Sequence, residues 1–317
     1  MNLLASMRYL VALNEHRHFG RAALASHITQ PALSNALRAL EREFGVLIVK
    51  RGRTFAGLTA EGEAVLSTAR RMLHEQELLI ERLGSEANLP GGTLRLAAVP
   101  TATPILARFA VELQRRHPGI TPTVLSMSSQ EIETALDGMA VDMALGYIGR
   151  TQVREVSLMV WPQFVERYYF VRRLPPARRP RAPGVHAGEP MRWDEAAQQP
   201  LCLLTSDMHN RAIVDSAFRE AGCTVRPAMD TNSIYTLTST ISAGALAGVL
   251  PDVTLELLHG GVFEARPLLQ PTLETPLGFM SYRSDRVSRA LEAAIALLQD
   301  AQWLESLRGL SAPTLLP

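Results

Sequence analysis

The chain has 317 residues, 47% of them hydrophobic, which is enough for two globular domains, each with a core of its own. No apolar run reaches the roughly 20 residues that a membrane helix needs, and charges interrupt the apolar runs near the N-terminus. We therefore expect no membrane span, no signal peptide and a location in the cytosol. Two cysteines, Cys202 and Cys223, are too few for a disulfide-stapled secreted protein, and no residue cluster suggests a metal or another cofactor.

The net charge of +1 conceals an uneven distribution along the chain. Residues 1–58 contain eight Lys or Arg and three acids, so this segment carries +5 and the remainder carries −4. A compact basic segment on a mildly acidic body is typical of a protein that meets nucleic acid at one end. A merely solvated basic surface would give the same charge pattern.

Three helices are predicted in the basic segment. Apolar residues recur at helical spacing over residues 7–13, and residues 19–25 suggest a second, short helix. A third helix is predicted for about residues 30–44, because Thr29 is a good N-cap and Pro31 is tolerated in a first turn. The predicted core side of this third helix consists of Leu33, Ala36, Leu37, Leu40 and Phe44.

The opposite side of the third helix carries short hydrogen-bonding groups beside long cations. Serine and asparagine reach base edges at short range, and arginine binds guanine or phosphate, so this mixture is typical of a recognition helix. Residues 46–49 are predicted to form a short strand that returns at residues 58–59, which makes a wing with cations at its tip. The candidate DNA-contacting residues are Thr29, Gln30, Pro31, Ser34, Asn35, Arg38, Lys50, Arg51 and Arg53.

Four strings of residues occur in the segment in a fixed order: Phe19-Gly20-Arg21-Ala22-Ala23, Thr29-Gln30-Pro31-Ala32-Leu33-Ser34, Leu40-Glu41-Arg42-Glu43-Phe44-Gly45-Val46 and Leu58-Thr59-Ala60-Glu61-Gly62. They closely resemble the LysR-type transcriptional regulators, and weaker agreement runs across almost the whole chain. The resemblance implies an N-terminal winged helix-turn-helix that binds double-stranded DNA, with contacts at the residues matching Gln30, Pro31, Ser34, Arg38, Arg51 and Arg53. Val49 and Lys50 depart from the family pattern, where an aromatic residue and an acid are common, and make the wing more basic.

A proline-free stretch from Thr59 to about Glu86 is predicted to form one long linker helix. Its apolar residues alternate spacings of three and four, which is typical of a coiled-coil seam. The family resemblance implies that the seam makes a homodimer and that a homotetramer follows, whereas an ordinary amphipathic core helix would show the same spacing. The candidate dimerisation residues are Leu66, Ala69, Leu73, Gln76, Ile80 and Leu83, and the seam is widened by Val65, Met72 and Leu79.

After Gly92, short apolar runs alternate with helical patterns, which is typical of an α/β domain with parallel strands. Two such sets are separated by an Arg- and Pro-rich loop, so we expect two lobes, and this resembles the type 2 periplasmic-binding-protein fold that LysR-type regulators carry. The predicted organisation is a winged helix-turn-helix domain at 1–58, a linker helix at 59–89 and a regulatory domain at 90–317. Lobe one comprises about 93–162 and 268–303, and lobe two comprises about 163–267.

Hydroxyl-rich junctions follow four of the predicted strands. In this fold a ligand lies between the lobes at the strand carboxyl ends, where helix N-termini present free N–H groups and partial positive charge. Helix capping explains each junction taken singly. Together they favour a small, polar and anionic effector. The candidate effector-binding residues are Thr101, Thr103, Ser128, Ser129, Tyr147, Thr205 and Asn232.

Other classes of protein fit the sequence less well. No grouped catalytic signature occurs, so we expect no enzyme, and a secreted solute-binding protein would leave the basic segment unexplained. A peroxide-sensing branch of the family uses a cysteine pair, but Cys202 lies in an apolar run and Cys223 follows a glycine, which favours structural roles. The identity of the effector, the operator and the direction of regulation stay open, as does RNA polymerase as a further partner.

Overall fold

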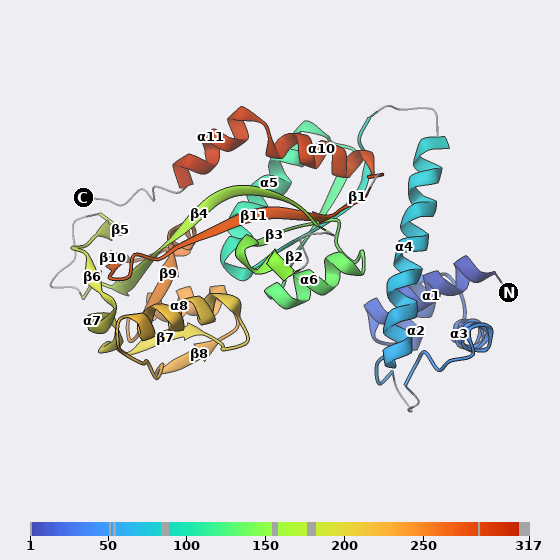
Figure 1. Cartoon of the computed structure of the whole chain (residues 1–317), viewed down its shortest axis with the longest axis horizontal. Helices are drawn as coiled ribbons and strands as arrows, with labels where there is room; N and C mark the ends of the chain where they lie inside the picture. Colours follow the sequence, from blue (N-terminus) through green and yellow to red (C-terminus); the bar gives the residue numbers. More distant parts are fainter. Residues whose placement is uncertain are drawn as a thin grey trace. The chain divides into compact units, whose positions relative to one another are not determined.

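The computed structural model describes residues 2–50, 52, 55–83, 89–153, 158–175, 182–284 and 286–310. The chain divides into two compact units (Figure 1). The first unit comprises residues 1–89 together with 134–141 and 284–288, and the second comprises 90–133, 142–283 and 289–317. Each unit has a hydrophobic core of its own and is described by itself.

The first unit is built from four helices: α1 Leu3–His16, α2 Phe19–Ala25, α3 Gln30–Phe44 and α4 Ala60–Leu83. Side-chain caps fix where the first three begin, because Asn2, His18 and Thr29 each accept hydrogen bonds from backbone N–H groups of the first turn. Their apolar faces meet in one core, to which Leu66 of α4 also belongs. The start of the linker helix is therefore part of the N-terminal domain's packing.

Two details of the first unit differ from the sequence-based expectation. Phe44, predicted for the core side of α3, is 42% exposed, because it ends the helix beyond the last buried residue, Leu40. The described residues of the wing contain a single antiparallel bridge, between Val49 and Leu58, where a strand over residues 46–49 was expected. Two backbone bonds flank that bridge, from Lys50 N–H to the carbonyl of residue 57 and from the N–H of residue 59 to the carbonyl of residue 48, both at 3.0 Å.

The second unit is organised around an eleven-stranded sheet with the main strand order β2-β1-β3-β11-β4-β9-β7-β8. Its strands are β1 Gly92–Ala98, β2 Ile120–Ser126, β3 Met143–Tyr147, β4 Leu158–Arg173, β5 Gly184–Ala187, β6 Met191–Arg192, β7 Leu201–Leu204, β8 Met229–Thr231, β9 Ala247–Pro251, β10 Val262–Leu269 and β11 Glu274–Tyr282. The helices are α5 Thr103–Arg116, α6 Ser129–Asp137, α7 Trp193–Ala197, α8 His209–Glu220, α9 Ile234–Ala243, α10 Arg289–Leu298 and α11 Ala301–Leu310, with short 3-10 turns η1 Pro100–Ala102, η2 Ile148–Val153 and η4 Asp252–Leu257.

Two lobes share the long strand β4. Its first part pairs antiparallel with β11, and its last part pairs with β9 and β10. In lobe one, β1, β2 and β3 run parallel, and the ring of Phe109 lies 4.6 Å from that of Phe279 and 5.3 Å from that of Trp303. The C-terminal helix α11, which carries Trp303, thus returns to lobe one.

The sheet of lobe two is covered on both faces, which explains why β7 is apolar throughout. Alternate residues of a strand point to opposite faces of a sheet. Leu201 and Leu203 join the core cluster that includes α8, whereas Cys202 and Leu204 join the cluster that includes α9. Figure 1 shows α8 lying over the strands β7 and β8.

Candidate DNA-binding face and effector site

The predicted recognition face of α3 is open to solvent. Gln30, Pro31, Asn35 and Arg38 are exposed and Ser34 is partly buried, while Leu33, Leu37 and Leu40 face the core. The hydroxyl of Thr29 accepts a hydrogen bond from the N–H of residue 32 at 3.4 Å, so its structural role is capping. In the wing, Lys50 is exposed, and Arg51 and Arg53 lie outside the described residues.

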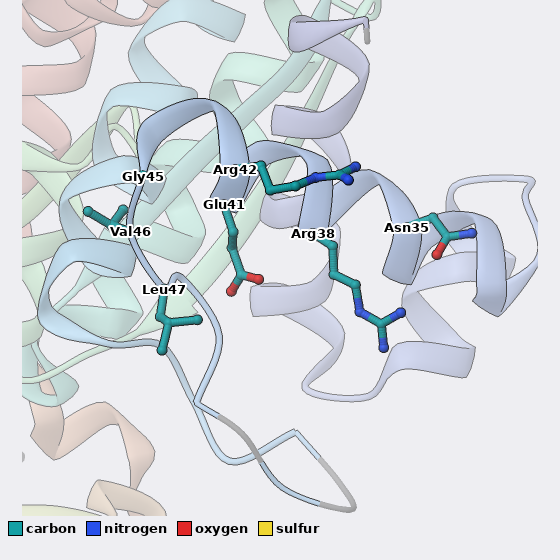
Figure 2. A pocket seen from close by; sticks show the side chains of 7 residues that line it. All are labelled: Asn35, Arg38, Glu41, Arg42, Gly45, Val46 and Leu47. Carbon is teal, nitrogen blue, oxygen red and sulfur yellow. The ribbon is translucent and has the colours of Figure 1, made fainter.

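Two shallow pockets of about 590 Å³ and 460 Å³ lie along this face. Arg38, Glu41 and Leu47 line both, and Figure 2 shows the larger pocket with the side chains of Arg38 and Arg42 extending from α3. The smaller pocket reaches the wing at Val49, Lys50 and Gly52. Residues of α3 and of the wing therefore line the same face, on which Arg38, Arg42 and Lys50 are cations.

Sequence reasoning missed an aromatic contact between the helices and the wing. The guanidinium carbon of Arg17 lies 5.7 Å from the centre of the Phe55 ring, and the ring of Phe19 meets the same ring edge-on at 6.2 Å. Arg17 ends α1 in the left-handed region, with φ 50°. No short sequence motif predicts this contact, because it joins residues almost 40 positions apart.

In the second unit, a closed ring of hydrogen bonds connects the two lobes. The amide nitrogen of Asn210, in α8, donates to the hydroxyls of Tyr147 at 3.2 Å and Tyr168 at 3.1 Å. Both hydroxyls donate in turn to Oε2 of Glu166, at 3.3 and 3.2 Å. Thr101 Oγ1 is 3.0 Å from the Tyr147 hydroxyl and extends the ring to η1. The donor and acceptor directions of these hydrogen bonds are compatible, because each amide or hydroxyl proton has one acceptor.

Burial dominates the electrostatics of this ring. Glu166 is completely buried, which raises its pKa to about 8, and the nearby carboxyl of Asp252 adds to the shift. Burial likewise raises the pKa of Asp252 to about 6 and that of the Tyr147 hydroxyl well above its usual value. Among the described residues, Oε1 of Glu166 and Oδ2 of Asp252 have no hydrogen-bond partner. Glu166 is therefore largely protonated at neutral pH.

The hydroxyl residues of the predicted junctions fall into distinct groups. Thr103 bonds to the carbonyl of residue 99 at 3.4 Å, and Ser128 forms a reciprocal capping box with Glu131 at the start of α6. By contrast, Ser129 Oγ and Thr205 Oγ1 are buried and have no hydrogen-bond partner among the described residues. Asn232 is exposed at the start of α9. The structure brings Thr101 and Tyr147 into direct contact.

A second bridge joins the lobes beside the ring. The ring of His209, the first residue of α8, meets the Tyr147 ring edge-on at 5.1 Å, and its Nδ1 lies 3.3 Å from Nη1 of Arg150. Arg150 also pairs with Glu133 of α6 at 3.2 Å. Burial, and then the Arg150 charge, lower the pKa of His209, so its imidazole is neutral at pH 7. Arg150 is a cation that the sequence analysis did not assign to this region.

Comparison with known proteins decides the family. Residues 4–63 match the family of bacterial regulatory helix-turn-helix proteins of the lysR type, and residues 87–303 match the LysR substrate binding domain. The chain belongs to the LysR family. Regulators of this family bind DNA, form oligomers and are not enzymes.

Individual LysR regulators resemble the chain over much of its length. A probable HTH-type transcriptional regulator, LrrA of Synechococcus elongatus, is 29% identical over 78% of this chain and 80% of its own. A full-length OxyR variant of Pseudomonas aeruginosa is 25% identical, with a TM-score of 0.68 over 92% of this chain and 96% of that one. The structure of CbnR with its target DNA is 18% identical, with a TM-score of 0.63 over 93% and 98%, and shows the same fold.

Part of the predicted linker seam packs against the chain's own N-terminal helices and is not free for a second copy. Leu66 and Ala69 are buried, and Gln76 Oε1 accepts a hydrogen bond from Arg8 of α1 at 2.8 Å. Leu73 is partly buried, and the side chain of Leu83 lies outside the described part of the chain. Among the described side chains of α4, the large apolar residues that stay open are Met72, Leu79 and Ile80, which are 39%, 48% and 58% exposed.

The two cysteines of this LysR protein have the surroundings of structural thiols. Burial raises the pKa of both, which disfavours the reactive thiolate. Cys202 belongs to the core cluster on one face of the lobe-two sheet, and Cys223 packs against the cluster on the other face, with its Sγ 3.2 Å from the carbonyl of residue 218. A disulfide between them would require this lobe to rearrange.

No helix among the described residues is long and apolar enough to cross a membrane. No group of three or more His, Cys, Asp or Glu side chains there is arranged to hold a metal ion.

Proposed function

We propose that this LysR-type regulator binds operator DNA through α3 and the wing and is controlled by a small anionic metabolite held between the lobes of its regulatory domain. The proposed domains are 1–58 for DNA binding, 59–89 for the linker and 90–317 for regulation. The DNA contacts are assigned to the recognition face, from Thr29 to Arg38, and to the wing cations. Because chromosomal DNA is the partner, the protein acts in the cytosol.

One observation carries the effector proposal: the buried hydroxyls of Ser129 and Thr205 have no hydrogen-bond partner among the described residues, and each precedes by four residues a contact of Arg150. Ser129 lies one helical turn before Glu133 in α6, and Thr205 lies four residues before His209. Glu133 and His209 both contact Arg150, so the segments that carry the two hydroxyls come from opposite lobes and meet at this arginine. A buried hydroxyl that lacks a partner costs about 1–3 kcal/mol, which a ligand oxygen would recover.

Three features support an anionic effector. The first turn of α8 has no side-chain cap and presents backbone N–H groups and partial positive charge, whereas the capping box of Ser128 and Glu131 already occupies two N–H groups at the start of α6. Arg150 contributes a full positive charge at the bridge. Glu166, protonated near neutral pH, does not repel an anion and has a proton to donate. A small carboxylate or oxoanion fits this combination of donors.

The effector proposal is tested on the full chain. A thermal-shift screen of small carboxylates and oxoanions identifies compounds that raise the melting temperature, since a ligand that prefers the folded state stabilises it. Calorimetry then compares wild type with Ser129→Ala, Thr205→Val and the control Ser216→Ala, an exposed serine of α8. We expect the first two variants to lose about 5- to 10-fold in affinity and the control to lose none. Unchanged affinity in all three would place the ligand elsewhere.

The DNA contacts are tested by titrating labelled duplexes. Ser34→Ala and Arg38→Ala should weaken binding to an operator isolated by selection from random sequence, since each direct contact to a base is worth about 1–3 kcal/mol. Arg51→Ala and Arg53→Ala should instead lower affinity for any duplex and flatten its salt dependence. Unchanged binding by all four variants would contradict the assignment of this face.

The assembly is proposed to be a homodimer through α4 and a homotetramer beyond it. The exposed apolar side chains of Met72, Leu79 and Ile80 support this assignment, because a helix with such a face gains by packing on another copy. Light scattering of the full chain at micromolar concentration tests it, and a monomer there would contradict it. RNA polymerase is a further proposed partner of the DNA-bound form.

Peroxide sensing is the second candidate function. A hydrogen peroxide-inducible genes activator from Pectobacterium carotovorum is 32% identical over 45% of this chain, which is the observation in its favour. The raised pKa of Cys202 and Cys223 and their positions on opposite faces of the sheet speak against it. Mass spectrometry of peroxide-treated protein distinguishes the two, since a metabolite sensor should form no disulfide at low peroxide.

A further inference from the structure

Glu41 is an acid in the middle of a surface suited to meet phosphate. Among the described residues that line the two pockets of the DNA-binding face, it is the only acid, and Arg38, Arg42 and Lys50 are the cations. A carboxylate there repels the DNA backbone and partly cancels the charge that attracts it. Because this charge disfavours DNA binding, we expect another role for the Glu41 carboxylate in the contacts that it makes.

The Glu41 carboxylate binds the backbone of the wing. Oε1 of Glu41 accepts hydrogen bonds from the N–H groups of Ile48 at 2.9 Å and Val49 at 3.2 Å. Figure 2 shows the carboxylate turned away from Arg42 and toward the backbone that follows Leu47. The two backbone bonds that flank the bridge between Val49 and Leu58 use neither of these N–H groups, and the Glu41 carboxylate satisfies both.

The same stretch of backbone is held from its other side by the start of α4. The carbonyl of Ile48 accepts a hydrogen bond from the N–H of Thr59 at 3.0 Å, and the Thr59 hydroxyl donates to the carbonyl of Leu47. Thr59 also caps α4 through the N–H of Gly62 at 2.9 Å, and a Cβ on Gly62 would overlap the Ile48 carbonyl oxygen. The base of the wing is thus fixed between the recognition helix and the linker helix.

We propose that Glu41 is a positioning residue for DNA binding: its carboxylate holds the base of the wing against α3, so that the wing cations and Arg38 reach DNA together. The assignment rests on the proposed DNA-binding face. In it, Glu41 acts through the backbone of Ile48 and Val49 and reads no base itself. Its hydrogen-bond acceptor is needed, and its negative charge is not.

The test separates the hydrogen-bond acceptor of Glu41 from its negative charge. The full-length protein is titrated at several salt concentrations with two labelled duplexes, one of arbitrary sequence and one carrying the selected operator. The proteins are wild type, Glu41→Gln, Glu41→Ala, Arg38→Ala and the control Glu43→Ala, which removes an exposed acid of the same helix. Glutamine keeps an oxygen acceptor without the charge, and alanine removes both. The melting temperature and the oligomeric state of each variant are measured alongside.

The proposal expects opposite results for the two substitutions. Glu41→Ala should lower affinity about tenfold near 0.1 M salt for each wing cation that no longer reaches a phosphate, and its salt slope should fall by about 0.9 for each. Glu41→Gln should keep the wild-type slope and bind at least as tightly, since repulsion is removed. Glu43→Ala also removes a negative charge, so it should bind no more weakly than wild type.

Several outcomes would overturn the proposal. Wild-type affinity and slope in Glu41→Ala would show that the wing needs no such support. Equal losses in both Glu41 variants would show that the charge matters and the acceptor does not. If Glu41→Gln loses only its preference for a selected operator, Glu41 reads a base instead. Normal binding by Arg38→Ala would contradict the recognition face itself, which is a separate failure.

Discussion

Replacing Glu166 by glutamine should change how the stability of the regulatory domain depends on pH. The side chain is completely buried, and its Oε2 accepts from the hydroxyls of Tyr147 and Tyr168. Glutamine has nearly the same shape and offers a carbonyl oxygen to both hydroxyls, but it cannot ionise. The substitution thus removes the titration while keeping most of the packing.

The magnitude follows from the pKa of Glu166. Burial raises it from 4.5 to about 8, so the folded domain holds this proton more tightly than the unfolded chain. Stability from this group is therefore complete below about pH 4.5 and is lost as the pH rises toward 8. At about 1.4 kcal/mol for each pH unit, the loss reaches about 4 kcal/mol at pH 8. The glutamine variant should escape this loss.

The assay uses urea denaturation followed by tryptophan fluorescence between about pH 5 and pH 8. All three tryptophans of the chain belong to the second unit, so the signal reports on the domain that contains Glu166; they are Trp161, Trp193 and Trp303. Glu220→Gln, at the exposed end of α8, is the matched control. Relative to wild type, the Glu166→Gln domain should gain stability steadily as the pH rises. Parallel curves for wild type and Glu166→Gln would refute the reasoning.

Three further changes have defined expected outcomes. Ile80→Asp places a carboxylate on the exposed apolar face of α4 and should weaken dimerisation by a few kcal/mol, as measured by analytical ultracentrifugation. Gly62→Ala puts a Cβ against the carbonyl of Ile48 and should lower the melting temperature of the DNA-binding unit, unlike an alanine at the exposed position 63. Asn210→Leu removes the donor shared by the two tyrosines and should destabilise the regulatory domain by about 1–3 kcal/mol in urea titrations, and an unchanged midpoint would contradict a role for the ring.

The sequence predicted the helices of the DNA-binding unit well because their signals are local. Thr29 and Gly45 mark the ends of α3, and its apolar spacing identifies the face that packs. The packing partner of Leu66 and Ala69 was harder to predict. Helical spacing shows that a helix face is buried, but it does not show which element covers that face. Here α1 of the same chain takes that place at the start of α4.

The candidate effector site was only partly predictable, because its key contacts join side chains distant in sequence. Capping chemistry identified the hydroxyl junctions, yet only contacts distinguish Ser128, which caps α6, from Ser129, which has no partner among the described residues. One signal for Glu166 was available. Alternation along β4 puts it on the same face as Phe164, Tyr168 and Phe170, and an acid on a buried face is a candidate functional group.

The ring and the Arg150 bridge together limit how an effector can act. The ring joins Tyr147 of lobe one to Asn210 of lobe two through a strand that belongs to both, while the bridge lies one helical turn from Ser129. A ligand that bonds to Ser129 and Thr205 changes the balance between lobe arrangements only by binding one of them more tightly. The buried hydroxyls favour an arrangement in which both reach the same ligand. Effector binding should therefore draw α6 and α8 together and reinforce the contacts that Arg150 makes with both helices.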